Sequence, residues 1–181
     1  MACNTEPDNR YVIAIGAAAL DEYYTADTWP LEGGKAMVDY KEDMIGGMIP
    51  NAACVFAGYG VHTYLVDTLK SNSRKTDMIV DDLKAHGVKT ELLRYREDIP
   101  DARTIIILTD KERTILVVEP HKPALDIKAS ELDTFRNASY IYTTPVELKN
   151  IRNHMEFVDD LKSHHVRLVF DIEASTVDVC D

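Results

Sequence analysis

Short apolar runs alternate along this chain with segments in which apolar residues recur at helical spacing. The run at residues 11–16 ends in glycine and is typical of a strand buried on both faces of a sheet, and residues 62–66 repeat the pattern. Further strands are predicted at residues 91–95, 140–143 and 167–171. An acid, Asp171, closes the last of these runs.

Helices are predicted between these strands. Residues 51–59 and 73–86 each end just before a glycine, which is a natural helix stop. In the second of them, Met78, Ile79 and Leu83 fall at helical spacing. The clearest pattern predicts one helix after residue 143, with a single apolar face made of Leu148, Ile151, Met155, Val158 and Leu161.

Two segments do not fit this alternation. Residues 104–108 and 114–118 are β-branched runs joined by a charged turn, which predicts a hairpin. Residues 25–44 are mixed and are expected to hold short antiparallel strands. Strands alternating with helices predict an α/β fold with a doubly wound, mostly parallel sheet, and the two exceptions predict a small β-sheet that projects from one edge.

Composition and charge narrow the class of protein. The chain has 181 residues, enough for one domain, and its net charge of −11 and pI near 4.9 argue against nucleic acid or an anionic membrane as the main partner. Residues 1–10 do not resemble a signal peptide, and no apolar run is long enough to cross a bilayer. Cys3, Cys54 and Cys180 are odd in number and widely spaced, which fits a reducing compartment and shows no metal-ligand spacing. These features predict a cytoplasmic protein without a metal site.

Candidate binding chemistry is concentrated at residues 45–58. Gly46 and Gly47 permit positive φ and a close approach to a ligand, and Pro50 suits the first turn of a helix. With Asn51, they place free N–H groups and an amide at one spot, which suits a ligand with many hydroxyls or an anion. An ordinary tight loop before a buried helix explains the glycines as well.

This glycine stretch resembles the first signature of the ribokinase-like, or PfkB-type, carbohydrate kinases. That signature reads G-G-x-x-x-N followed by small residues, here Gly46-Gly47-Met48-Ile49-Pro50-Asn51-Ala52-Ala53. Residues 16–21 resemble the family's first strand and its substrate-binding aspartate, which here is Asp21. Residues 104–118 resemble the lid strands that cover the sugar, and residues 83–88 resemble the L-x-x-x-G-V ending of the second helix. The order and spacing of these segments make the resemblance specific.

The resemblance runs from Val12 to Asp171 but covers only the N-terminal part of the family's domain. It implies that residues 1–181 are a single N-terminal part of a ribokinase-like domain, with lid segments at approximately residues 22–45 and 97–120 and without the nucleotide-binding C-terminal part. It further implies a sugar or nucleoside as substrate, ATP and Mg²⁺ as cofactors of the full-length enzyme but not of this chain alone, and a homodimer formed through the lid strands. In that dimer, one face of the lid would cover the sugar and the other would pack against the second subunit.

The resemblance also assigns roles to particular residues. Asp21 would accept hydrogen bonds from two sugar hydroxyls, Asn51 would donate and accept, and the Gly46-Gly47 backbone would allow close approach. Arg103 and Thr143 are further candidates for sugar contacts. Each residue also has a plainer role: Asp21 can cap a turn, Asn51 can be a helix N-cap, Arg103 can be a solvated lid charge, and Thr143 can cap the following helix.

The sequence departs from the family pattern in ways that bear on catalysis. The family's anion hole and catalytic aspartate lie in the motif D-T-x-G-A-G-D, which does not occur here, and G-x-x-x-x-G-K-[ST] is also absent. Ala19 stands where sugar-binding members often carry asparagine, and Thr143 stands where some have a sugar-contacting acid. Phosphoryl transfer requires a base and donors for the developing charge, so no catalytic residue is expected in this chain.

Two other classes of protein stay open. A non-catalytic sugar-binding or assembly module would explain the missing motif directly. A dinucleotide-binding oxidoreductase would explain a strand, a glycine and then an acid. It needs G-x-G-x-x-G opening a helix, however, and here Gly16 is followed by alanines.

Overall fold

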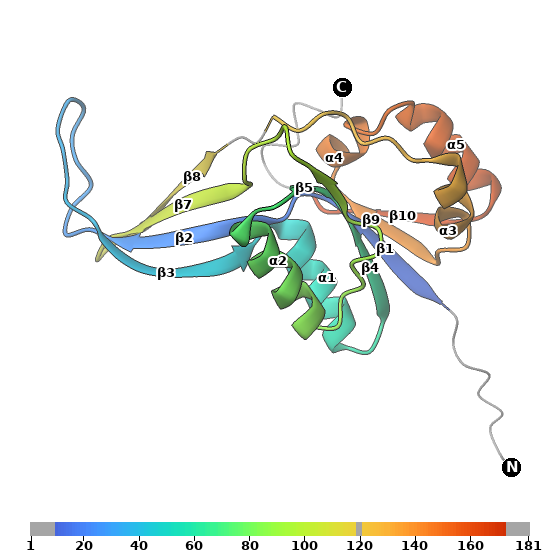
Figure 1. Ribbon diagram of the computed structural model, residues 1–181, viewed down its shortest axis with the longest axis horizontal. Helices are drawn as coiled ribbons and strands as arrows, with labels where there is room; N and C mark the ends of the chain where they lie inside the picture. Colours follow the sequence, from blue (N-terminus) through green and yellow to red (C-terminus); the bar gives the residue numbers. More distant parts are fainter. Residues whose placement is uncertain (1–9, 119–120, 173–181) are drawn as a thin grey trace, which may run out of the picture.

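The computed structural model describes residues 10–118 and 121–172 (Figure 1). The strands are β1 (Tyr11–Ile15), β2 (Ala19–Thr25), β3 (Asp39–Gly46), β4 (His62–Val66), β5 (Thr68–Lys70), β6 (Arg94–Arg96), β7 (Arg103–Leu108), β8 (Arg113–Val118), β9 (Tyr140–Thr143) and β10 (Arg167–Phe170). The helices are α1 (Met48–Gly58), α2 (Arg74–Ala85), α3 (Leu132–Arg136), α4 (Pro145–Lys149) and α5 (His154–Ser163), with a 3₁₀ turn at Ala129–Glu131. None of the helices in these ranges is long and apolar enough to cross a membrane.

A parallel sheet in the order β10-β9-β1-β4 forms the centre of the body. Successive side chains of β1 point to opposite faces, as in any strand. On one face, Ile13 packs in a core cluster with Phe135 of α3 and with residues of α5. On the other, Ala14 packs in a second cluster with Ile49 of α1 and Leu83 of α2. Helices therefore cover both faces, and the predicted doubly wound, mostly parallel α/β fold is confirmed.

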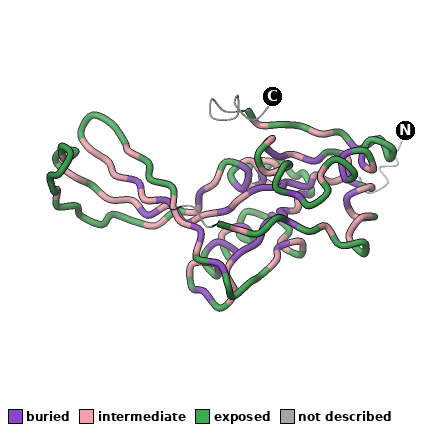
Figure 2. The backbone as a smooth tube through the Cα atoms, turned by 90° about the horizontal axis from the view of Figure 1, so that it is seen from above, coloured by how far each residue is buried: buried purple, intermediate pink, exposed green. Residues whose placement is uncertain are grey.

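A separate sheet in the order β3-β2-β7-β8 projects from this body and is called the lid sheet below. Its central pair, β2 and β7, is parallel, while β2–β3 and β7–β8 are antiparallel. The predicted hairpin is confirmed as β7 and β8. Figure 2 shows that buried residues are concentrated in the body and are sparse along the projecting sheet.

The predicted long helix after residue 143 is wrong, because the segment forms α4 and α5 instead. Between them, the backbone of Asn150 accepts a hydrogen bond from the N–H of Leu125, and the N–H of Arg152 donates to the carbonyl of Leu125. These bonds to a neighbouring segment replace helical ones, and Asn153 then takes a left-handed conformation with φ of 54° before α5 begins. Met155, expected on the apolar face, is 61% exposed.

Other boundaries also differ from the sequence prediction. The strand expected at residues 91–95 begins only at Arg94. Of residues 25–44, where short antiparallel strands were expected, residues 39–44 lie in β3, which pairs antiparallel with β2, whereas residues 26–38 contain no strand. Helix α2 is confirmed, with Ser73 as its N-cap, but Met78 is partly exposed rather than buried in the core. The spacing of apolar residues predicted where these helices and strands lie in the sequence but not the residues at which they begin and end.

One buried carboxylate bonds the segment by which the chain first enters the lid sheet and the segment by which it last leaves it. Asp67 directly follows β4 and is 6% exposed. It accepts hydrogen bonds from the backbone N–H groups of Ala18, just before β2, at 2.9 Å and of Thr68 at 2.6 Å. Lys122, which follows β8, donates to its two oxygens at 2.6 and 2.9 Å. The start and the end of the lid are thereby held at the end of β4.

A second buried acid joins the lid sheet to helix α2. Glu22 of β2 is 6% exposed, and its carboxylate pairs with Lys75 of α2 and, at 3.5 Å, with Arg103 of β7. Burial raises the pKa of Glu22, but the hydrogen bond from Lys75 and the charges of Lys75 and Arg103 outweigh it, so the pKa lies below its usual range. The ionised carboxylate is therefore the form that the fold prefers.

We predict that Lys75→Met destabilises the protein, because it leaves Glu22 buried without its lysine donor. The free energy of unfolding in urea should fall by about 1.5–3 kcal/mol, the usual worth of a hydrogen bond to a charged group. Lys84→Met, at an exposed position of the same helix, is the control and should change it by less than about 0.5 kcal/mol. Equal effects of the two substitutions would show that the contact with Glu22 contributes nothing. Because the pKa of Glu22 is lowered, the loss caused by Lys75→Met should shrink as the pH falls through that pKa.

Candidate functional site

The pairing of the lid strands determines which side chains share a face. Asp21 of β2 lies opposite Met44 of β3 and Thr104 of β7, and residues paired across neighbouring strands point to the same face. The adjacent residues Glu22 and Arg103 point to the opposite face, where Glu22 meets Lys75 of α2. The Asp21 face of the lid sheet is therefore the one turned away from that contact.

Asp21 packs directly against Gly46. A Cβ added at Gly46 would fall on the carboxylate of Asp21, so no larger residue fits there without displacing the acid. Burial raises the pKa of Asp21, and a side-chain hydrogen bond with Thr104 opposes that rise. Within the described residues, the buried acids Glu22 and Asp67 are paired with lysines, whereas the partly buried carboxylate of Asp21 meets a hydroxyl.

Gly47 connects the lid sheet to helix α1. It is the N-cap of α1 and has φ of +108°, a conformation that favours glycine, and a Cβ there would overlap the carbonyl oxygen of Ala17. Pro50 lies in the first turn of α1, as predicted. The structure thus brings Asp21, Gly46 and Gly47 together at the point where β2, β3 and α1 meet.

The structure places the other candidates elsewhere. Asn51 is not the N-cap of α1; its backbone N–H donates to the carbonyl of Gly47 at 3.1 Å, and the residue lines a cavity between α1 and α2. Arg103 lies on the lid face opposite Asp21, paired with Glu22. Thr143 is fully buried, and its hydroxyl donates to the carbonyl of Ile15 at 2.8 Å. Thr144, not Thr143, accepts the capping bond of α4.

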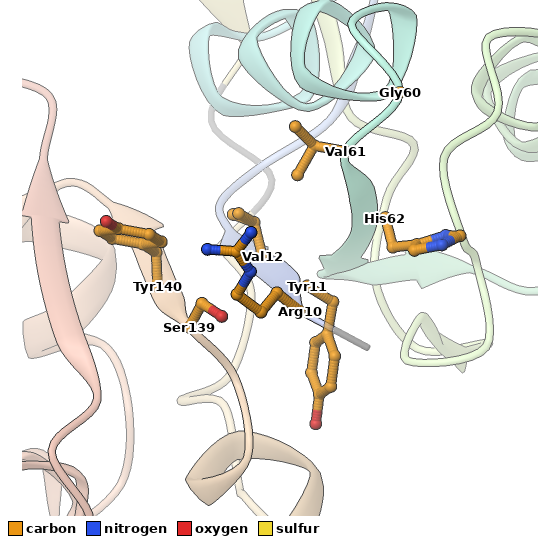
Figure 3. A pocket seen from close by; sticks show the side chains of 8 residues that line it. All are labelled: Arg10, Tyr11, Val12, Gly60, Val61, His62, Ser139 and Tyr140. Atoms are coloured by element: carbon orange, nitrogen blue, oxygen red, sulfur yellow. The ribbon is translucent and has the colours of Figure 1, made fainter. Parts of the chain in front are cut away.

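A cavity of about 560 Å³ lies at the opposite end of the central sheet. Figure 3 shows Ser139 and Tyr140 on one side of it and Val61 and His62 on the other, at the amino ends of β9 and β4. Ligands of open α/β sheets bind beyond the carboxyl ends of the strands. The amino-end cavity is therefore not the candidate substrate site.

The sequence did not predict one group of potential metal ligands. Cys54 of α1 lies with Asp82 of α2 and His86, the residue that ends α2, and their potential metal-ligating atoms are all within 4.8 Å of one another. Asp82 and His86 are spaced i,i+4 on one helix, which is a visible signal, but only the packing of α1 on α2 adds the cysteine. Burial and the charge of Asp82 raise the pKa of the Cys54 thiol.

A scan against protein-family models and a search of curated proteins gave no match. Solved structures do match. Ribokinase of Arabidopsis thaliana complexed with ribose and ATP superimposes with a TM-score of 0.74 at 20% identity, over 90% of this chain and 53% of that one. Ribokinase from Giardia lamblia gives 0.70 at 16% identity, over 94% and 53%. The PfkB protein from Polaromonas sp. JS666 gives 0.69 at 13% identity, over 92% and 57%.

This chain therefore spans about half the length of these solved structures while matching them over nearly its whole described length. At such low identity, the likeness concerns the fold. This chain contains a parallel sheet with helices on both faces and a separate, projecting lid sheet (Figure 1). The chain has the ribokinase-like fold of sugar kinases.

Proposed function

We propose that this chain binds a sugar or nucleoside and is the substrate-binding part of an ATP-dependent carbohydrate kinase, which transfers the γ-phosphate to a hydroxyl of that substrate. The observation that carries the proposal is the position of Asp21. Its carboxylate lies against Gly46, where any larger residue would displace it, on the lid face turned away from α2. In the described part of the chain, this partly buried acid has no lysine or arginine partner, so it is poised to accept from hydroxyls.

The neighbouring groups suit a polyol. Gly46 leaves room for the Asp21 carboxylate to lie against the backbone, and Thr104 supplies a hydroxyl beside Asp21. Asn51 remains a proposed ligand that would act from the first turns of α1. Arg103 and Thr143 have less support, because their polar groups already bond Glu22 and the Ile15 carbonyl.

The nucleotide chemistry is assigned to the full-length enzyme. The Arabidopsis ribokinase structure contains ATP with ribose, which supports ATP as the phosphoryl donor, and Mg²⁺ would neutralise charge on its phosphates. We place the catalytic base and the anion hole in a part of the fold that has no counterpart here. This chain alone is expected to bind neither cofactor and to phosphorylate nothing, and the full-length enzyme is expected in the cytoplasm.

A non-catalytic sugar-binding or assembly module is the second candidate. The dinucleotide-binding alternative has less support, because β1 leads through residues 16–18 into strand β2 and not into the helix that a dinucleotide fingerprint requires. Sequencing the parent open reading frame for G-A-G-D beyond this chain would separate the first two.

We further propose a homodimer through the lid strands. The edge strand β8 exposes Leu116 at 43% and Val117 at 70%, and these point to opposite faces of the lid. Val117 is paired with Thr104 and so shares the Asp21 face, whereas Leu116 is paired with Ile105 and lies on the other face. Leu116 is therefore the residue placed to meet a second subunit while the Asp21 face covers the substrate.

Asp21→Ala should weaken sugar or nucleoside affinity roughly ten- to a hundredfold, because a carboxylate that accepts from buried hydroxyls is worth about 1.5–3 kcal/mol. Calorimetry with a panel of ribose, fructose and adenosine measures this, first on the wild type to find the best ligand. Asp39→Ala removes an exposed lid carboxylate and should leave the affinity unchanged. Equal affinity of wild type and Asp21→Ala would remove Asp21 from the site.

Asp21→Asn should raise the melting temperature at pH 7. The pKa of Asp21 is raised in the folded state, so the fold holds the proton more tightly than the unfolded chain, and stability falls as the pH rises through that pKa. The amide avoids this loss, so its advantage should vanish as the pH drops below the ordinary value of 3.8. Scanning calorimetry from pH 3 to 8 checks the trend, which a less stable variant at pH 7 would contradict.

Leu116→Asp should yield monomers in sedimentation velocity, because it places a charge on the face assigned to the second subunit. Val117→Asp is the matched control, since it puts the same charge on the adjacent residue of the opposite face and should leave the dimer intact. A wild-type protein that sediments as a monomer at all concentrations would rule the dimer out.

A further inference from the structure

We propose that this protein binds a zinc-class divalent cation between helices α1 and α2, through Cys54, Asp82 and His86. None of these three residues is a proposed sugar ligand. The potential ligating atoms of Cys54, Asp82 and His86 already lie within 4.8 Å of one another. A tetrahedral zinc ion with bonds of about 2.0–2.3 Å needs its ligands roughly 3.3–3.8 Å apart, so small side-chain rotations close the site. Asp82 and His86 are 40% and 55% exposed at the side chain, and that leaves them free to rotate.

The chemical types of the three ligands indicate which metal would bind. Thiolate, imidazole and carboxylate together suit Zn²⁺ or Co²⁺ and do not suit Mg²⁺, which prefers oxygen ligands. The Nδ1 atom of His86 lies 2.9 Å from the backbone carbonyl oxygen of Asp82. Nδ1 also lies 3.3 Å from Oδ2 of Asp82, so the ring borders the carboxylate that would share the cation. With a proton on Nδ1 donating to the carbonyl, Nε2 would carry the free lone pair, and the ring would turn it toward the cation.

The surroundings favour a cation. The three residues line a cavity of about 710 Å³ that is also lined by the acidic residues Asp43 and Asp81. One oxygen of Asp43 is buried and has no hydrogen-bond partner. His86 ends α2, so the site also receives the partial negative charge of a helix C-terminus. Three protein ligands leave a coordination position open toward the cavity.

The site lies away from Asp21, although Asn51, the other proposed sugar ligand, lines the same cavity. Asp43 is paired with Glu22 across β2 and β3, so it belongs to the lid face opposite Asp21. A bound cation would join α1 to α2, and α2 carries the lysine that bonds Glu22. Because Asp21 lies on the other face of the lid sheet and is not a metal ligand, loss of the metal site should leave sugar binding at Asp21 unchanged. The two proposals can therefore be tested independently.

The test uses cobalt as a spectroscopic substitute for zinc. Cys3→Ser and Cys180→Ser are combined first, so that Cys54 is the remaining thiol of the full chain. Titration with Co²⁺ should then produce a thiolate-to-cobalt absorption band in the near ultraviolet that saturates at a single site per chain. Zn²⁺ should remove the band by displacing cobalt, and Mg²⁺ should not.

Variants assign the ligands. Cys54→Ser should abolish the band, and Asp82→Asn and His86→Gln should each weaken cobalt affinity at least about tenfold. The control is His164→Gln, because His164 repeats the same geometry on α5, with Nδ1 2.8 Å from the carbonyl oxygen of Asp160, but belongs to no such three-residue group among the described residues. It should change nothing.

Three results would overturn the proposal. The first is the absence of a saturable cobalt band in the protein that keeps only Cys54. The second is a cobalt band that survives in Cys54→Ser. The third is an equal loss of cobalt affinity in His164→Gln and His86→Gln. Circular dichroism confirms folding of each variant, and Cys54→Ala takes the place of Cys54→Ser if the serine variant unfolds. The calorimetric affinity for sugar, measured in parallel on Cys54→Ser, should stay at the wild-type value.

Discussion

The arrangement of this molecule depends on the buried carboxylate of Asp67. The lid sheet is built from two stretches of chain that leave the body and return to it, and Asp67 bonds the start of one, at Ala18, and the end of the other, at Lys122. A buried ion pair is costly to form in the absence of further hydrogen bonds, and here two backbone N–H groups supply them. Removing Lys122 would leave a charge that the surrounding core cannot solvate. The pair therefore sets where the lid begins relative to the carboxyl ends of β1 and β4.

The strand that follows this anchor carries two adjacent acids with opposite environments. Glu22 faces α2 and is held ionised by Lys75 and Arg103, which stabilise the lid against the body. Asp21 faces the other way, and burial without a cationic partner raises its pKa, which makes its charge a cost to the fold. Strand alternation alone produces this division, because neighbouring side chains point to opposite faces. One β-strand thus separates a stabilising acid from the acid proposed for binding.

Much of the fold could be predicted from the sequence, because short apolar runs and the β-branched hairpin are local signals. That Asp21 lies close to Gly46 and Gly47 was predicted only from the family resemblance. Hydrophobic periodicity describes one segment at a time and cannot show that residues of two segments are neighbours in space. The break between α4 and α5 was missed because it depends on hydrogen bonds to Leu125, which lies far away in the sequence. The Cys54 group was missed for the same reason: a pattern on α2 gives two ligands, and only helix packing adds the third.

The proposed substrate site is the Asp21 face of the lid sheet. Proton–nitrogen correlation spectra of the chain, titrated with ribose, fructose and adenosine, test it most directly. For at least one of these ligands, we expect saturable shifts at the backbone amides of Asp21, Gly46, Gly47 and Thr104, with those of Val61 and Tyr140 at the amino-end cavity unchanged. Saturable shifts that map to the amino-end cavity instead, or no shifts with any ligand of the panel, would contradict it.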